Sequence, residues 1–136
     1  MSYALTVAVD QSHGDTVEQI RDALRAQGFG ILTEIDIQAT LKTKLGVDVP
    51  QLVILGACNP PLAHAALQAE PSIGLLLPCN VVVRTAPDGT TIVEAVDPQT
   101  MVALTGNTAL QTVADDATRR LKAALDSLTN RSTEET

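Results

Sequence analysis

Residues 81–96 read VVVRTAPDGTTIVEAV, and this stretch decides the predicted fold. Two runs rich in β-branched residues, Val81–Thr85 and Thr91–Val96, flank the turn signal PDG at 87–89, a pattern typical of a β-hairpin. An antiparallel hairpin favours an α+β domain over a doubly wound parallel sheet. The strand expected at residues 3–9 supports this choice, because its large and small residues alternate as if only one face were buried.

Periodicity and capping signals extend the prediction to the order β-α-β-α-β-α-β-β-α, with helices packed on one face of a mostly antiparallel sheet. Besides the hairpin, the expected strands are 3–9, 29–35, 52–55 and 75–86, the last broken by Pro78. The expected helices open near Asp15 and end at Gly28, open at Asp36 and end at Gly46, run from Pro60 to about Glu70, and span 108–128. We expect one domain over residues 1–128 and a polar, disordered tail over 129–136.

Composition excludes several classes of function. The chain carries 9 Lys and Arg against 16 Asp and Glu, a formal net charge of −7, and its aromatic residues are Tyr3 and Phe29. Nucleic-acid binding needs clustered cations and flat rings for base stacking, so we expect no nucleic-acid partner. No apolar run approaches the ~20 residues of a membrane span, so we expect no membrane partner and a cytoplasmic location.

The first candidate site is residues 54–64, ILGACNPPLAH. Asn59 is a favoured N-cap and the proline after it suits a first helical turn, so Cys58 is expected just before a helix N-terminus. The positive end of a helix dipole favours a thiolate placed there. Helical geometry allows His64 to share a site with Cys58. A phosphate cradle is not expected, because two successive prolines remove backbone N–H donors.

The second candidate site is residues 75–81, LLLPCNV, which repeats the Cys-Asn pair inside a predicted strand. Pro78 cannot donate to a strand ladder, so it indicates an edge or a bulge that re-aims Cys79 and Asn80. Neither cysteine belongs to a CxxC pair, which argues against a zinc-ribbon or thioredoxin-like site. In a cytosolic chain of this size we expect free thiols rather than a structural disulfide.

Four motifs together resemble the domain of unknown function 302 family: GFGILTEID at 28–36, LGACNPPLAH at 55–64, LLLPCNVVV at 75–83 and VDP at 96–98. The likeness covers roughly residues 3–125. It implies an α+β domain similar to the sheet-and-helix fold of TATA-box-binding protein, often seen as a dimer, and it names no activity and no cofactor. The recurring positions of the family correspond here to Glu34, Asp36, Cys58, Asn59, His64, Cys79, Asn80 and Asp97.

The favoured interpretation is a binding module, in which the two Cys-Asn pairs meet at one pocket that holds a small ligand or a soft metal. The candidate ligand-binding residues are Glu34, Cys58, Asn59, Cys79 and Asn80. The candidate metal ligands are Cys58, His64 and Cys79, since thiolate and imidazole suit zinc, Cu(I) or haem iron. We expect a homodimer, as the resemblance implies.

Two other interpretations stay open. A thiol enzyme would use Cys58 as nucleophile, Cys79 as resolving thiol and His64 as base. A dimeric structural protein would need no chemistry at the cysteines, which would then be small buried apolar residues. In that interpretation Asn59 is simply a helix cap and Glu34 a solvent-facing strand residue.

Overall fold

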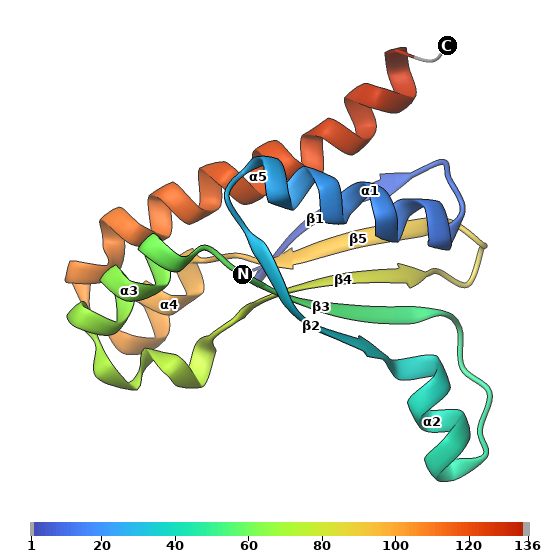
Figure 1. The fold of residues 1–136 in the computed structure, drawn as a ribbon, viewed down its shortest axis with the longest axis horizontal. Helices are drawn as coiled ribbons and strands as arrows, with labels where there is room; N and C mark the ends of the chain where they lie inside the picture. The colour runs from blue at the N-terminus through green and yellow to red at the C-terminus, as the bar shows by residue number, and fades with distance from the viewer. Residues whose placement is uncertain (1, 135–136) are drawn as a thin grey trace.

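The hairpin expected at residues 81–96 contributes the central strand of the sheet and one of its neighbours (Figure 1). The structure is a computed structural model that describes residues 2–134, with side chains up to residue 129. Its elements are, in chain order, β1 (Ala4–Val9), α1 (His13–Ala26), β2 (Gly30–Asp36), α2 (Ile37–Leu45), β3 (Leu52–Cys58), α3 (Pro60–Ala69), the 3-10 helix η1 (Pro71–Leu76), β4 (Cys79–Thr85), β5 (Thr91–Val96), α4 (Gln99–Thr105), the 3-10 helix η2 (Thr108–Leu110) and α5 (Gln111–Glu134).

The five strands pair antiparallel throughout, in the order β1-β5-β4-β3-β2. In the hairpin, Val81 lies opposite Ala95 and Thr85 lies opposite Thr91. Gly89 in the connecting turn has a φ of 89°, a conformation that glycine adopts without steric cost. The fold is therefore α+β with an antiparallel sheet, as predicted.

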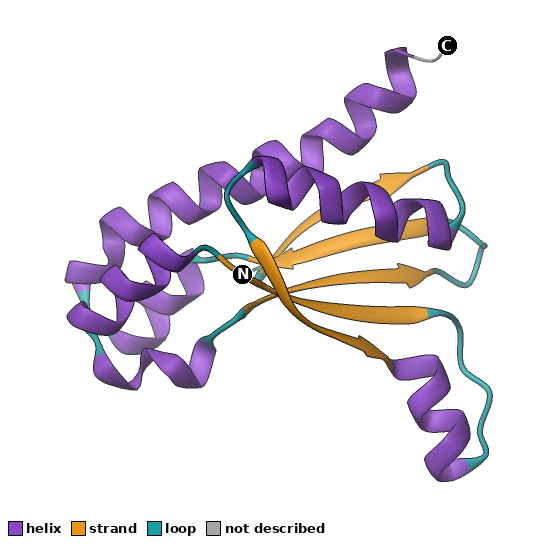
Figure 2. Cartoon of the chain, in the orientation of Figure 1, coloured by secondary structure: helices purple, strands orange, loops and turns teal. Residues whose placement is uncertain are grey.

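The alternation of side chains along the strands decides which face of the sheet is covered. Val81, Val93 and Ala95 are each at most 1% exposed and belong to the main core. They face the side on which α1 and α5 lie (Figure 2). Arg84 and Glu94, at alternate positions, form an ion pair of 2.7 Å on the other face. Burial of the valine-rich face thus holds the sheet against these two helices.

A second, smaller apolar cluster forms beyond the end of the sheet where β3 stops and β4 starts. Its buried members come from α3, η1, α4 and η2 and are Ala66, Ile73, Met101 and Leu110. Helix α5 packs on α1 and β1 along the main core and on α3 and α4 beside the smaller cluster. The molecule therefore has two apolar cores joined by one long helix.

Gly28 ends α1 as predicted, through a defined hydrogen-bond motif. Its N–H donates to the Arg25 carbonyl and the N–H of Phe29 donates to the Leu24 carbonyl, both at 3.0 Å. This pair of bonds, with Gly28 at a φ of 86°, is a Schellman motif. Leu24 and Phe29 are both buried in the main core, so the motif fixes the path of the chain from α1 into β2.

The predicted start of α1 near Asp15 is wrong. Ser12 is the N-cap, because its hydroxyl accepts from the Asp15 N–H at 3.2 Å, and the helix begins at His13. The His13 side chain is buried, and its Nε2 lies 2.9 Å from the Val83 carbonyl oxygen. A local cap at Ser12 therefore sets the start of the helix, and a long-range bond to β4 also holds its first turn.

The ends of α2 agree with the prediction. The Asp36 carboxylate accepts from the Ala39 N–H at 2.9 Å and caps the first turn. Gly46, with a φ of 69°, ends the helix, and its N–H donates to the Lys42 carbonyl. Both signals act within one turn of the chain, which is why the sequence predicts them.

The strand expected from residue 75 starts later than predicted. Residues 71–76 form η1, and β4 begins at Cys79, directly after the cis peptide bond between Leu77 and Pro78. The missing N–H of proline prevents this part of the chain from joining the ladder.

A β-bulge between Ile31 and Thr33 interrupts the alternation expected along β2. Ile31 lies opposite Ala57 and Glu34 lies opposite Leu55, so both point toward the covered face of the sheet. The strict alternation of the strand expected at residues 29–35 predicts Ile31 and Glu34 on opposite sides of the sheet, and this prediction is wrong. The inserted residue of the bulge shifts the phase of every side chain that follows it.

Helix α5 runs to Glu134, beyond residue 128 where the sequence predicts its end. Residues 129–134, expected in the polar tail, belong to this helix, and residues 135 and 136 lie outside the described residues. Within residues 2–134, no helix combines the length and the hydropathy needed to cross a bilayer.

Candidate functional site

The two Cys-Asn pairs lie at the same end of the sheet. β3 ends at Cys58, β4 begins at Cys79, and Ala57 lies directly opposite Cys79 in the strand pairing. Both cysteines are free, and both line one pocket of about 340 Å³. We call it the inner pocket; its walls come from β3, β4, α3, α4 and α5 and include Phe29, Cys58, Ala63, Leu67, Cys79 and Val113. The structure thus brings the two cysteines together.

The inner pocket lies between the two apolar cores. Phe29 and Ala57 on one wall belong to the main core, whereas Ala66 and Met101 on the other belong to the smaller cluster. Among the residues that the structure describes, no Asp, Glu, Lys, Arg or His side chain lines it. Small residues in α3 and α5 leave the space open, because an alanine cannot fill the gap between two packed layers. The pocket is suited to apolar, uncharged groups.

Asn59 holds the segment that carries Cys58. Its Oδ1 accepts from the Leu62 N–H at 3.3 Å and caps α3, and Pro60 occupies the first helical position. The side chain of Asn59 is only 7% exposed and lines the inner pocket. The capping role expected from sequence therefore coincides with a place in the pocket wall.

The Cys79 thiol is held in its protonated form. Burial, and to a smaller extent the charge of a nearby Cys58 thiolate, together raise the pKa of this thiol from 9.0 to about 11. Burial has this effect because an apolar surrounding disfavours the charged form of a thiol. At neutral pH Cys79 is therefore a small polarisable apolar group rather than a nucleophile or a thiolate ligand.

His64 lies apart from the two cysteines. Its side chain is exposed on α3, and it lines neither the inner pocket nor the second pocket described below. Among the described residues, no three His, Cys, Asp or Glu side chains are grouped so as to hold a metal ion. The expected metal set of Cys58, His64 and Cys79 is therefore not assembled.

The acidic candidates also lie away from the cysteines. The Glu34 carboxylate forms an ion pair with Arg21 of α1, and it lines neither pocket. The bulge in β2 turned Glu34 toward this helix. Asp97 accepts from the Gln99 N–H at 3.0 Å and supports the first turn of α4. These contacts give both acidic residues structural partners of their own.

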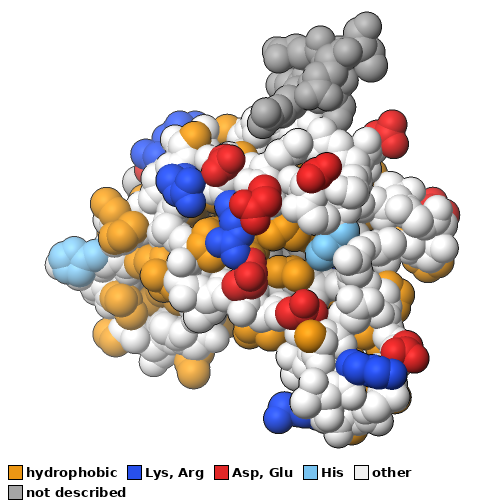
Figure 3. Space-filling view, turned by 45° about the vertical axis from the view of Figure 1, so that its right-hand side comes forward, with side chains coloured by type: hydrophobic (Ala, Val, Ile, Leu, Met, Phe, Trp, Pro, Cys, Tyr) orange, Lys and Arg blue, Asp and Glu red, His pale blue; other side chains and the backbone are white. Residues whose placement is uncertain are grey.

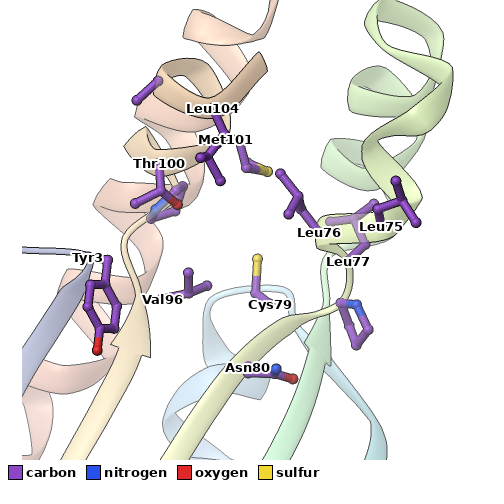
Figure 4. A pocket seen from close by; sticks show the side chains of 13 residues that line it. Tyr3, Leu75, Leu76, Leu77, Cys79, Asn80, Val96, Thr100, Met101 and Leu104 are labelled. Carbon is purple, nitrogen blue, oxygen red and sulfur yellow. The ribbon is translucent and has the colours of Figure 1, made fainter. Parts of the chain in front are cut away.

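A larger pocket of about 720 Å³ adjoins the inner one, and we call it the outer pocket. It opens between η1 and α4 and includes Tyr3, Leu76, Asn80, Val96, Thr100 and Leu104 (Figure 4). Leu77, Pro78, Cys79 and Met101 line both pockets. Asn80 therefore belongs to the outer pocket and is separated from the inner pocket by the residues that the two share.

Exposed leucines surround the outer pocket. Leu75 is 87% exposed and Leu104 is 72% exposed, and Tyr3 beside them is 75% exposed. On the face shown in Figure 3, hydrophobic side chains gather at the end of the molecule formed by α3 and its neighbours, whereas many charged side chains lie elsewhere on that face. A group of exposed apolar side chains such as this one is typical of a surface that binds a ligand or another molecule.

Several pocket residues were not predicted from the sequence. Met101 and Leu104 lie on α4, and Val113 lies on α5, far along the chain from either Cys-Asn pair. The leucine run before Pro78 was a usable signal, because consecutive exposed leucines are unusual in a strand of a soluble domain. No local pattern indicates which helices close over the end of the sheet.

Fold and site together define a small antiparallel α+β domain with an uncharged pocket between two apolar cores. The family described as "Domain of unknown function DUF302" matches residues 5–128, and the chain belongs to this family, as its four motifs predicted. A crystal structure of the uncharacterized conserved protein DUF302 from Bacillus stearothermophilus is 32% identical and superimposes with a TM-score of 0.88. The match covers 94% of this chain and 99% of that one. No curated protein matches the sequence.

Proposed function

We propose that this protein is a binding module that takes an uncharged, largely apolar small molecule into the inner pocket. The observation that carries the proposal is a space of about 340 Å³, lined by both cysteines, in which no charged side chain is present. An engineered apolar cavity of roughly 150 Å³ already binds benzene, so this space is large enough for a bigger ligand.

Burial of apolar surface supplies the binding free energy in such a pocket. A ligand that fills it gains dispersion contacts with walls that are already in place, such as Phe29 and Ala66, both of which are at most 3% exposed. The pre-formed walls lower the conformational entropy that binding must overcome. In this proposal Cys58 and Cys79 contribute soft, polarisable contacts to the ligand.

The other interpretations have less support. A two-thiol redox centre needs a readily formed thiolate, and burial keeps Cys79 protonated at neutral pH. A soft-metal site would lack its third expected ligand, because His64 lies apart from the two cysteines. His64 is exposed and lines neither pocket, which leaves the thiol-enzyme interpretation without its expected base. The homodimer and the cytoplasmic location remain predictions, and the mass of the protein in solution tests the first.

Nile red, an uncharged dye that fluoresces in apolar surroundings, tests the proposal. We expect the protein to bind it at one site, and Ala63→Trp to weaken binding by about tenfold or more, because the new ring fills the inner pocket. Ala65→Trp is the matched control, since Ala65 lies on the same helix but lines neither pocket. Native mass spectrometry of protein purified without additives should reveal a bound uncharged molecule.

Two results would contradict the proposal. One is a wild-type protein that binds no dye at micromolar concentrations. The other is equal dye binding by Ala63→Trp and Ala65→Trp when circular dichroism shows that both variants are folded, because binding would then not involve the inner pocket.

A further inference from the structure

We infer that the inner and outer pockets form one elongated site for an uncharged amphiphile, a molecule with a hydrocarbon chain and a neutral polar end such as a hydroxyl or carbonyl group. The chain would occupy the inner pocket and the polar end the outer pocket. This inference rests on the proposed function, because it assigns a chemical class to the ligand of the same site.

The first argument is that the two pockets adjoin and share part of their lining. Leu77, Cys79 and Met101 line both. Figure 4 shows Met101 on α4 and Leu76 on η1 on opposite sides of a gap, with the Cys79 sulfur pointing toward it. Methionine has an unbranched, flexible side chain that moves between rotamers at low cost. A rotation of the Met101 side chain is the movement by which, in this inference, the two spaces would join.

The second argument concerns charge. None of the described residues that line either pocket is an Asp, Glu, Lys, Arg or His. A charged ligand end would therefore find no ion-pair partner in either lining, and a charge drawn toward the apolar inner pocket would be costly. The chain as a whole has a formal net charge of −7, so an anionic end would also be repelled. The ligand end must therefore be neutral.

The third argument fixes the orientation. The outer pocket contains the polar side chains Tyr3, Asn80 and Thr100. Within the part of the chain that the structure describes, the Asn80 amide makes no hydrogen bond, so it is available to a ligand, whereas the Tyr3 hydroxyl points away from the gap (Figure 4). In the inner pocket the polar side chain besides the thiols is Asn59, whose Oδ1 already caps α3. The polar end of the ligand therefore belongs in the outer pocket.

A series of straight-chain 1-alkanols, from hexanol to tetradecanol, tests the chemical class by displacement of Nile red. We expect affinity to rise about fourfold for each added CH₂ until both pockets are filled, which corresponds to the usual gain for a buried methylene. At equal chain length, the carboxylate and the primary ammonium compounds should bind at least about tenfold more weakly than the alcohol. Equal affinities for the three head groups would overturn the inference.

Two pocket-filling variants separate this inference from the proposed function. Ala103 is exposed and lines the outer pocket alone, so Ala103→Trp should weaken dodecanol about tenfold and leave hexanol unchanged. Ala63→Trp should weaken both alcohols. Ala109→Trp, at an exposed position outside both pockets, is the control. If Ala103→Trp binds dodecanol as well as the wild type does, the elongated site is overturned, but ligand binding in the inner pocket is not. If the wild type does not bind hexanol, the proposed function itself is overturned.

The orientation is tested by fluorescence quenching, because the chain contains no tryptophan. Leu67→Trp places a single tryptophan at the inner pocket and Leu104→Trp places one at the outer pocket. 11-Bromo-1-undecanol carries its quenching bromine at the tail. We expect at least twofold stronger quenching in Leu67→Trp than in Leu104→Trp. The reverse pattern, or equal quenching, overturns the assigned orientation.

Discussion

The packing of β3 against the start of β4, where the two Cys-Asn pairs lie, depends on Gly56. This glycine lies in β3 opposite both Asn80 and Thr33, and it is buried. A Cβ at this position would overlap the Thr33 hydroxyl and would lie 2.9 Å from Cγ of Pro78. Because Gly56 has no side chain, Pro78 can lie against β3, and β4 begins directly after it at Cys79.

We expect Gly56→Ala to lower the free energy of unfolding by about 1–3 kcal/mol, the usual cost of overpacking. The rigid proline ring leaves the new methyl group little room, since Pro78 cannot rotate away. Urea denaturation measures the loss. Gly14→Ala is the control, because its added Cβ meets no atom within 4 Å. A Gly56→Ala protein as stable as Gly14→Ala would show that this packing tolerates the methyl group.

The raised pKa of Cys79 predicts how the free energy of unfolding changes with pH in the alkaline range. Its pKa in the folded protein is about 11 against an ordinary 9.0, so the unfolded chain loses this proton first. Unfolding therefore releases a proton between pH 9 and 11, and stability falls over that range by up to about 3 kcal/mol. Denaturation at successive pH values measures the slope, and Cys79→Ala should flatten it relative to the wild type. Identical slopes in the two proteins would remove the basis for a protonated Cys79.

At the scale of elements, the turn from α1 into β2 links the main core to the site. Gly28 provides the left-handed residue of the Schellman motif, and Phe29 directly after it lines the inner pocket. Arg120 of α5 donates from Nη1 to the Gln27 carbonyl at 2.9 Å, so the end of α1 is also held from outside. The start of β2 is thereby fixed against α5 and α3.

We expect Gly28→Ala to destabilise the fold by about 1–2 kcal/mol for the left-handed backbone alone. A further loss should come from the contact that the new Cβ makes with the Asn59 side-chain nitrogen, 3.0 Å away. Gly46→Ala is the matched control, because Gly46 has a φ of 69° and open space around it. Thermal unfolding should rank Gly28→Ala below Gly46→Ala. The opposite ranking would mean that the contact with Asn59 does not destabilise Gly28→Ala.

A comparison of the predicted and observed elements shows which structural features can be predicted from the sequence. Asp36 and Asn59 were predicted as caps because a cap bonds to an N–H three residues away. The hairpin was predicted because both strands and their turn are contiguous. The cap of α1 is equally local, since Ser12 accepts from the Asp15 N–H, but the prediction placed the cap at Asp15 instead. By contrast, the side of Glu34 depends on a bulge in β2. The bulge arises in the pairing with another strand, which no local pattern contains.

At the scale of the whole molecule, the two apolar cores imply unequal local stability. The strands β4 and β5 place fully buried valines in the main core, whereas α3, η1 and α4 enclose a smaller cluster with pockets on either side of the Cys79 segment. Fewer buried apolar contacts mean that a segment opens more often. The walls of the candidate site are therefore expected to be the more mobile part of the domain.

Hydrogen exchange should report this difference. We expect amides of residues 60–77 and 99–105 to exchange faster than those of β4 and β5 in the free protein. Saturation with Nile red or 1-dodecanol should slow exchange in the first group, since a ligand stabilises the state that binds it. Mass spectrometry of peptic fragments measures both effects. Uniform exchange across the chain would argue against two separately stable cores.

The candidate site was predictable only in part. The pairing of Cys58 with Cys79 at one pocket followed from two similar motifs at strand ends, and the structure brings them together. Glu34 and His64 carry suitable chemistry, but the fold directs them elsewhere. The closing wall from α4 depends on how a short helix packs after β5, and sequence spacing gives no measure of that packing.

The strand order has a consequence for the order in which the chain is completed. β1 is an edge strand whose one neighbour is β5, and Ala4 lies opposite Val96. During synthesis β1 leaves the ribosome before β5 and must therefore wait without its partner strand until the residues up to Val96 have emerged. Contacts between segments so distant along the chain also slow folding, because the entropy cost of closing a long loop comes before the free energy gained by strand pairing. β1 can therefore join the sheet only after β5 is available.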